Sequence, residues 1–198
     1  MRELNAEFIK QMAIEKKYQP MADELYKELF PGCEIETIEW EASSKNRMLQ
    51  MADIDRIIHT KDNKHIKISE KFRLPNKYPL HDITIELYSN LEKRKSGWSI
   101  HSDADYLFYF KGDKVCIVDA QDLKGIAEDI LKEVQNYDFE ACEINKLYKH
   151  PIQIKGMEVR GSIMIHQPGQ QSWKTVTYML PIKNLKNLSN KVRVRNVN

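Results

Sequence analysis

Residues 51–90 read MADIDRIIHTKDNKHIKISEKFRLPNKYPLHDITIELYSN and contain three short segments of β-strand character. Each segment carries charge at positions that a strand normally uses for packing. These residues are Asp53 and Asp55 in the first segment, Glu70 and Lys71 in the second, and Asp82 and Glu86 in the third. Carboxylates held beside a lysine on adjacent strands can bind a divalent cation and activate water. A charged sheet face in an ordinary soluble protein is the alternative interpretation.

The alternation of side chains in the second segment makes a specific prediction about Glu70. Successive side chains of a strand point to opposite faces, which places Glu70 among the apolar residues of segment 65–73 and Lys71 on the other face. A lone carboxylate on an apolar face is costly unless it is paired, metal-bound or protonated. We therefore predict that Glu70 is at least partly buried and has a cationic partner, either Lys71, Arg56 or a bound metal.

Hydrophobic periodicity and turn signals predict an α/β (α+β) fold with a central mixed sheet. Apolar residues recur at helical spacing on both sides of Pro20, where we expect a break, and again over residues 120–136. Residues 61–64 and the Gly112-Asp113 pair have the composition of hairpin turns. The predicted sheet contains segments 52–60, 65–73, 82–88, 104–111 and 114–118, flanked by the N-terminal helix and the helix over 120–136.

Length and composition favour a single intracellular domain. With 198 residues, of which 41% are hydrophobic, the chain can bury a full core. We predict one domain over residues 1–198, with a core at about 20–136 and a β-rich C-terminal extension at about 150–198. Three widely spaced cysteines disfavour disulfides and a zinc site, and no segment has the pattern of a signal peptide or membrane span. A cytoplasmic protein that does not enter membranes is expected.

The motifs DIDRII, ISEKFR, DITIELYSN, Gly97-Trp98 and DADYLFYF, together with a preceding helix that bears glutamates, resemble the PD-(D/E)XK nuclease superfamily. More narrowly, they are similar to small nuclease-like proteins, many of which phages or mobile elements encode. The resemblance covers roughly residues 20–135. It implies a restriction-endonuclease-like fold and a Mg²⁺ or Mn²⁺ cofactor. It also implies that Asp55 is a metal ligand, Glu70 the second acid, and Lys71 the lysine that orients or deprotonates the attacking water. In a nuclease of this kind we expect Asp53 or Glu86 to support the site from an adjacent position.

One departure from that pattern concerns the second acid. The usual motif separates the acid from the lysine by one residue, but the residue two before Lys71 is Ser69. Three outcomes are open. A bulge at Ser69-Glu70 can re-aim the acid, a carboxylate of the next strand such as Asp82 or Glu86 can replace it, or the site is inactive.

A basic loop supplies candidate contacts to nucleic acid. Its residues are Lys93, Arg94, Lys95 and Trp98, which could contact phosphates and stack on a base. The expected function is a Mg²⁺-dependent nuclease that hydrolyses DNA phosphodiester bonds, with a homodimer as one candidate assembly. The alternative is a catalytically inactive nuclease-like protein that binds nucleic acid or a protein partner as a mobile-element accessory factor.

Overall fold

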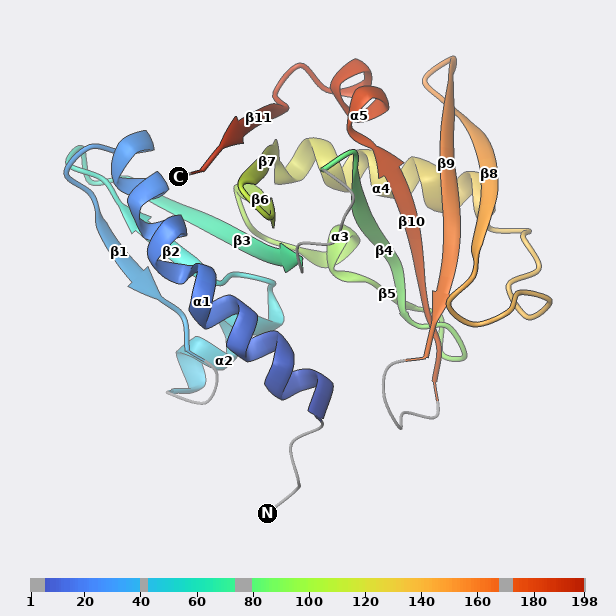
Figure 1. Cartoon of the computed structure of the whole chain (residues 1–198), viewed down its shortest axis with the longest axis horizontal. Helices are drawn as coiled ribbons and strands as arrows, with labels where there is room; N and C mark the ends of the chain where they lie inside the picture. The colour runs from blue at the N-terminus through green and yellow to red at the C-terminus, as the bar shows by residue number, and fades with distance from the viewer. Residues whose placement is uncertain (1–5, 40–42, 74–79, 168–172, 198) are drawn as a thin grey trace. The chain divides into compact units, whose positions relative to one another are not determined.

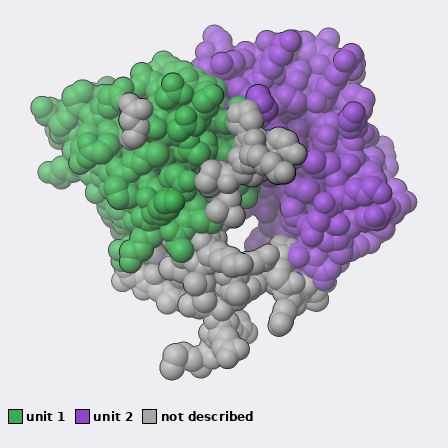
Figure 2. Space-filling model, in the orientation of Figure 1, with its two compact units in different colours: residues 1–80, 103–117, 193–198 green, residues 81–102, 118–192 purple. Residues whose placement is uncertain are grey.

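The computed structural model describes residues 6–39, 43–73, 80–167 and 173–197, with side chains from residue 13 onward. The sequence predicts one domain, whereas this chain forms two compact units (Figure 2). Unit 1 comprises residues 1–80, 103–117 and 193–198, and unit 2 comprises residues 81–102 and 118–192. Each unit is therefore assembled from separate stretches of sequence.

Unit 1 is built on a six-stranded mixed sheet, which confirms the predicted sheet type (Figure 1). Strands β3 and β6 run parallel, while β1 and β2, β2 and β3, and β7 and β11 pair antiparallel. The strands follow one another across the sheet in the order β1 (Glu34–Thr37), β2 (Arg56–His59), β3 (His65–Arg73), β6 (Tyr106–Lys111), β7 (Lys114–Asp119) and β11 (Arg193–Asn196).

Two helices belong to the sequence of unit 1. Helix α1 (Ala6–Leu29) continues through Pro20, so the predicted break is wrong. Its buried face, which includes Ala22 and Tyr26, packs in one apolar cluster with side chains of β2, β3, β6 and β7, and this burial offsets the cost of a proline inside the helix. Helix α2 (Ser44–Met51) is an element that the sequence did not predict, and the Ser43 hydroxyl caps it by accepting a hydrogen bond from the Asn46 amide.

Unit 2 contains a separate five-stranded antiparallel sheet, so the predicted placement of segment 82–88 in the central sheet is wrong. The segment lies in β4, which pairs with β10 and β5. The strand order is β5 (Lys95–Ser96), β4 (Asp82–Asn90), β10 (Thr175–Pro181), β9 (Met157–His166) and β8 (Leu147–Ile154). The predicted C-terminal β extension thus supplies three of these strands, and its tail supplies β11 of the other sheet.

Helices of unit 2 pack within the same unit. Helix α4 (Ala120–Val134), which Asp119 caps, contacts β4, β8 and the short α3 (Trp98–His101). The helix predicted over 120–136 thus belongs to unit 2. Helix α5 (Ile182–Leu188) follows β10 and contacts it.

Gly97, which precedes α3, has no room for a side chain. A Cβ atom there would lie 2.1 Å from the Glu86 carbonyl oxygen, which is backbone and cannot easily yield. We expect Gly97→Ala to lower the free energy of unfolding by about 1–3 kcal/mol. Gly125→Ala is the matched control, because nothing lies within 4 Å of its added methyl group in α4. This change should raise stability by about 0.5–1 kcal/mol. Urea unfolding of both variants checks the pair, and a Gly97→Ala protein as stable as wild type would contradict the expectation.

Candidate active site

Asp53 anchors a polar cluster where α2 leads into β2. Its backbone has a φ of 59°, in the left-handed region that favours glycine or asparagine after a helix, and strain of this kind often marks functional sites. Asp53 Oδ1 lies 2.6 Å from Lys71 Nζ, and Oδ2 accepts a hydrogen bond of 2.7 Å from the Ser69 hydroxyl. Lys71 Nζ also lies 3.0 Å from Ser69 Oγ. These contacts fix the direction of the lysine.

Asp55 is the second carboxylate of this cluster. Its amide donates to the Ile68 carbonyl at 2.8 Å, and its Oδ2 accepts a 2.7 Å hydrogen bond from the Glu70 amide. The same Oδ2 lies 3.9 Å from Lys71 Nζ. Burial raises the pKa of Asp55, as does the nearby Asp53 charge, while Lys71 lowers it. Because β2 begins at Arg56, both aspartates lie before the strand rather than on its face.

The three outcomes for the missing acid can now be compared. Strand β3 pairs with β6 in continuous register from Ile68 to Arg73, so there is no bulge at Ser69-Glu70. Asp82 and Glu86 lie on β4, which is not a neighbour of β3. The carboxylate bonded to Ser69 and Lys71 is instead that of Asp53.

Glu70 lies on the opposite face of β3 from Lys71, where its side chain is only 5% exposed and pairs with Arg56. Glu70 Oε2 lies 3.1 Å from Arg56 Nε, and the Tyr26 hydroxyl donates to Oε1 at 2.6 Å. The predictions of burial and of a cationic partner are both confirmed. Burial raises the pKa of Glu70 to about 7, although the Arg56 charge and the Tyr26 hydrogen bond lower it in part.

This raised pKa predicts a pH-dependent stability. Glu70 holds its proton more tightly in the folded protein than in the unfolded chain, where its pKa is near 4.5. Its contribution to the free energy of unfolding is therefore complete below pH 4.5 and is lost as the pH rises through about 7. We expect the free energy of unfolding to fall by roughly 3 kcal/mol across this window because of Glu70. Glu70→Gln mimics the protonated form and should show a flatter profile in urea titrations between pH 4.5 and 8. Identical profiles for the two proteins would contradict the assignment.

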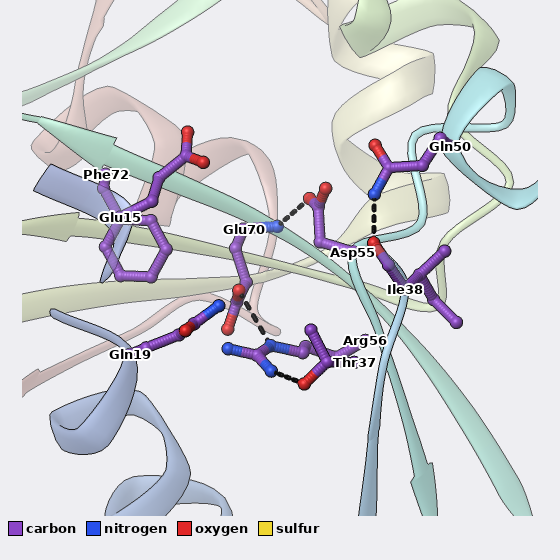
Figure 3. Close-up of a pocket in the computed structure, with 9 residues that line it drawn as sticks. All are labelled: Glu15, Gln19, Thr37, Ile38, Gln50, Asp55, Arg56, Glu70 and Phe72. Atoms are coloured by element: carbon purple, nitrogen blue, oxygen red, sulfur yellow. Dashed lines mark hydrogen bonds and ion pairs between the residues drawn. The ribbon is translucent and has the colours of Figure 1, made fainter. Parts of the chain in front are cut away.

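A polar pocket in unit 1 is lined by Asp55 and by the Glu70–Arg56 pair, whereas Asp53 and Lys71 do not line it (Figure 3). Figure 3 shows the Glu70 side chain directed toward Arg56 while its backbone nitrogen meets Asp55. Arg56 is 2% exposed and also bonds Thr37 on β1. The lining residues are Glu15, Gln19, Thr37, Ile38, Gln50, Asp55, Arg56, Glu70 and Phe72.

Sequence reasoning missed Glu15, Gln19, Thr37 and Gln50 as pocket residues. Glutamates on the N-terminal helix were part of the resemblance, but nothing in the sequence singled out Glu15 among them. Thr37 lies on β1, which pairs with β2, and Gln50 of α2 is held by a 2.6 Å hydrogen bond to the Ile38 carbonyl.

The remaining predicted residues belong to unit 2. Glu86 Oε2 accepts a 3.1 Å hydrogen bond from the Trp98 amide at the start of α3. The side chains of Lys93, Arg94 and Lys95 are exposed, as expected for a basic loop, and Trp98 is half-buried. The basic side chains are therefore accessible to a phosphate backbone, and Trp98 only in part.

The carboxylate oxygens of this site can be compared with the ligands that a Mg²⁺ ion requires. Both oxygens of Glu70 already have partners, so Glu70 does not fit as a ligand. Asp53 and Asp55 supply the hard oxygen atoms that Mg²⁺ prefers, and Mg²⁺ commonly uses one or two carboxylates with water and substrate phosphate. By the same criterion Asp55 fits, because its hydrogen bond and its contact with Lys71 both involve Oδ2, whereas both oxygens of Asp53 contact Lys71 and Ser69. Within the described residues, no group of three or more His, Cys, Asp or Glu side chains is arranged to hold an ion by itself.

Comparisons with family models, with curated proteins and with solved structures found no significant match to the chain. No helix among the described residues is long and apolar enough to cross a membrane.

Proposed function

We propose that unit 1 carries a Mg²⁺- or Mn²⁺-dependent nuclease site that hydrolyses DNA phosphodiester bonds. The observation that carries the proposal is the position of Lys71 Nζ, which Asp53 and Ser69 hold 3.9 Å from the Asp55 carboxylate. A cation beside two carboxylates, one of which lines a polar pocket, is an arrangement suited to placing water and stabilising negative charge on a phosphate.

Each residue of the site has a distinct role in this proposal. Asp55 would hold the metal, which when bound supplies Lewis-acid chemistry and a more acidic water, and Asp53 positions Lys71. Lys71 orients the attacking water and stabilises charge on the phosphate oxygens. Glu70 is a positioning residue, because its backbone N–H orients Asp55 while its side chain is held by Arg56. Lys93, Arg94 and Lys95 contribute phosphate contacts that add affinity without sequence preference.

One observation favours the second candidate, a catalytically inactive protein of this kind that binds nucleic acid or a protein partner. Ser69 stands where the usual motif has an acid, and the adjacent Glu70 is paired with Arg56. In that case Lys71 and Asp53, 2.6 Å apart, form a structural ion pair.

A cleavage assay with single-stranded, duplex and branched DNA separates the two candidates. We expect the wild-type protein to cut at least one substrate with Mg²⁺ or Mn²⁺ and none with a chelator. Asp55→Asn should reduce cleavage to the chelator background because it removes a ligand charge. Asp113→Asn is the matched control, since Asp113 is exposed in the β6–β7 turn of the same unit. Wild-type protein that cuts no substrate with either metal would favour the binding-only candidate.

A further inference from the structure

Two histidines face each other across the β2–β3 hairpin, apart from the candidate active site. His59 and His65 are directly opposite in the register, and Glu34 of β1 is opposite His59 on its other side. Directly opposite residues share one face of a sheet, so the three side chains form a row across three strands. His59 Nδ1 lies 2.7 Å from His65 Nδ1.

A carboxylate fixes the orientation of one of these rings. Glu36 Oε2 lies 3.0 Å from His59 Nε2, and Lys45 of α2 lies 3.7 Å from Glu36 Oε1. A neutral His59 that donates its Nε2 proton to Glu36 presents the lone pair of Nδ1 toward His65. Histidines that bind metals commonly have this arrangement, with a carboxylate on the nitrogen that does not bind the ion.

The hairpin holds the pair in place and leaves it open to solvent. The Thr60 amide donates to the Lys64 carbonyl at 3.0 Å, and Asn63 adopts a φ of 58° in the turn between the strands. The His59 side chain is 33% exposed and His65 is exposed, so an ion can reach both rings.

We propose that His59 and His65 bind a transition-metal ion of the Zn²⁺, Ni²⁺ or Cu²⁺ class through their Nδ1 atoms, with Glu36 as the positioning carboxylate. Imidazole nitrogen suits these ions, whereas Mg²⁺ prefers oxygen, so the site differs in chemistry from the candidate active site. Zn–N bonds are about 2.0–2.1 Å long. If the two Nδ1 atoms move slightly apart, the ion can take the place of the proton that they share in their hydrogen bond. His65 then carries its proton on Nε2, and water completes the coordination shell.

Calorimetric titration of tag-free protein with Zn²⁺, repeated with Ni²⁺ and Cu²⁺, tests the proposal. We expect one ion per chain, with binding lost in His59→Ala and in His65→Ala. Glu36→Gln should weaken binding by about 10–100-fold while leaving the stoichiometry unchanged. His101→Ala is the control, because His101 is exposed on α3, outside the row, and its loss should not alter the affinity.

Two further measurements distinguish a loss of metal binding from a loss of folding, and neither depends on nuclease activity. Circular dichroism of each variant checks that the fold is retained, and the imidazole proton NMR signals of His59 and His65 should shift on addition of Zn²⁺ in the wild-type protein. Folded His59→Ala and His65→Ala variants that bind as tightly as wild type would overturn the proposal. Wild-type protein that binds none of the three ions would overturn it as well, whether or not the protein cuts DNA.

Discussion

Lys71→Ala is expected to lower the rate of metal-dependent DNA cleavage by roughly 10²–10⁴-fold, the range typical of a group that acts in proton transfer or water positioning. Its Nζ is held by Asp53 and Ser69 beside Asp55, and alanine has no amine to take its place. Affinity for DNA should change little, because one lysine among many basic residues contributes only a small part of the phosphate attraction. Single-turnover cleavage and a binding titration on the same substrate separate the two quantities.

Lys67→Ala is the matched control for this experiment. Lys67 lies four residues earlier on β3, on the same face by alternation, but is exposed. Its removal should leave the rate within about twofold of wild type, since exposed substitutions rarely have larger effects on the fold. Removing Lys71 also leaves the largely buried Asp53 carboxylate without its cation, so a melting curve is needed for each variant. The double variant Lys71→Ala/Asp53→Asn restores charge balance if the single variant unfolds. A folded Lys71→Ala protein that cuts as fast as wild type would exclude the proposed role of the lysine.

Arg56→Met is expected to lower the free energy of unfolding by about 3–5 kcal/mol at pH 8, because it leaves the ionised Glu70 buried without a cation. The loss should be smaller at pH 5, where Glu70, with a pKa of about 7, is protonated and needs no cationic partner. Urea unfolding at the two pH values measures both effects.

The double variant Arg56→Met/Glu70→Leu should recover most of this loss, since apolar replacement of a buried ion pair is often neutral or stabilising. Arg47→Met is the control, because Arg47 is exposed on α2 of the same unit. It should change stability by less than about 0.5 kcal/mol. An Arg56→Met protein as stable as this control would contradict the view that the Arg56–Glu70 pair is energetically coupled.

The features predicted correctly are those that depend on local sequence. Alternation along β3 is a property of the strand itself, so the sequence alone predicts that Glu70 and Lys71 lie on opposite faces. The same alternation predicts the apolar environment of Glu70, and Arg56 was one of the three partners named for it. The hairpin between β2 and β3 follows from turn composition in the same way. Asp53, Asp55 and Lys71 were also named together, and the structure brings them together.

The features predicted wrongly depend on pairing between distant segments. Alternation in Asp82–Asn90 is the same whichever sheet the strand joins, and its partner β10 begins more than eighty residues later, at Thr175. Asp53 meets Lys71 from a left-handed turn rather than from a strand, and no alternation rule applies to a turn. Helix α2 was missed because a cap at Ser43 with few apolar residues after it resembles a loop.

Because unit 1 consists of three stretches of chain, of which the last is residues 193–198, it is completed last during synthesis on the ribosome. All of unit 2 has been translated by residue 192, whereas the sheet of unit 1 is completed only when Arg193–Asn196 emerges and β11 pairs with β7. Until then the backbone N–H and C=O groups along that side of β7 are unpaired. A nascent or prematurely terminated chain that stops at residue 192 would therefore present an open strand edge, the kind of surface on which other chains aggregate and which chaperones protect.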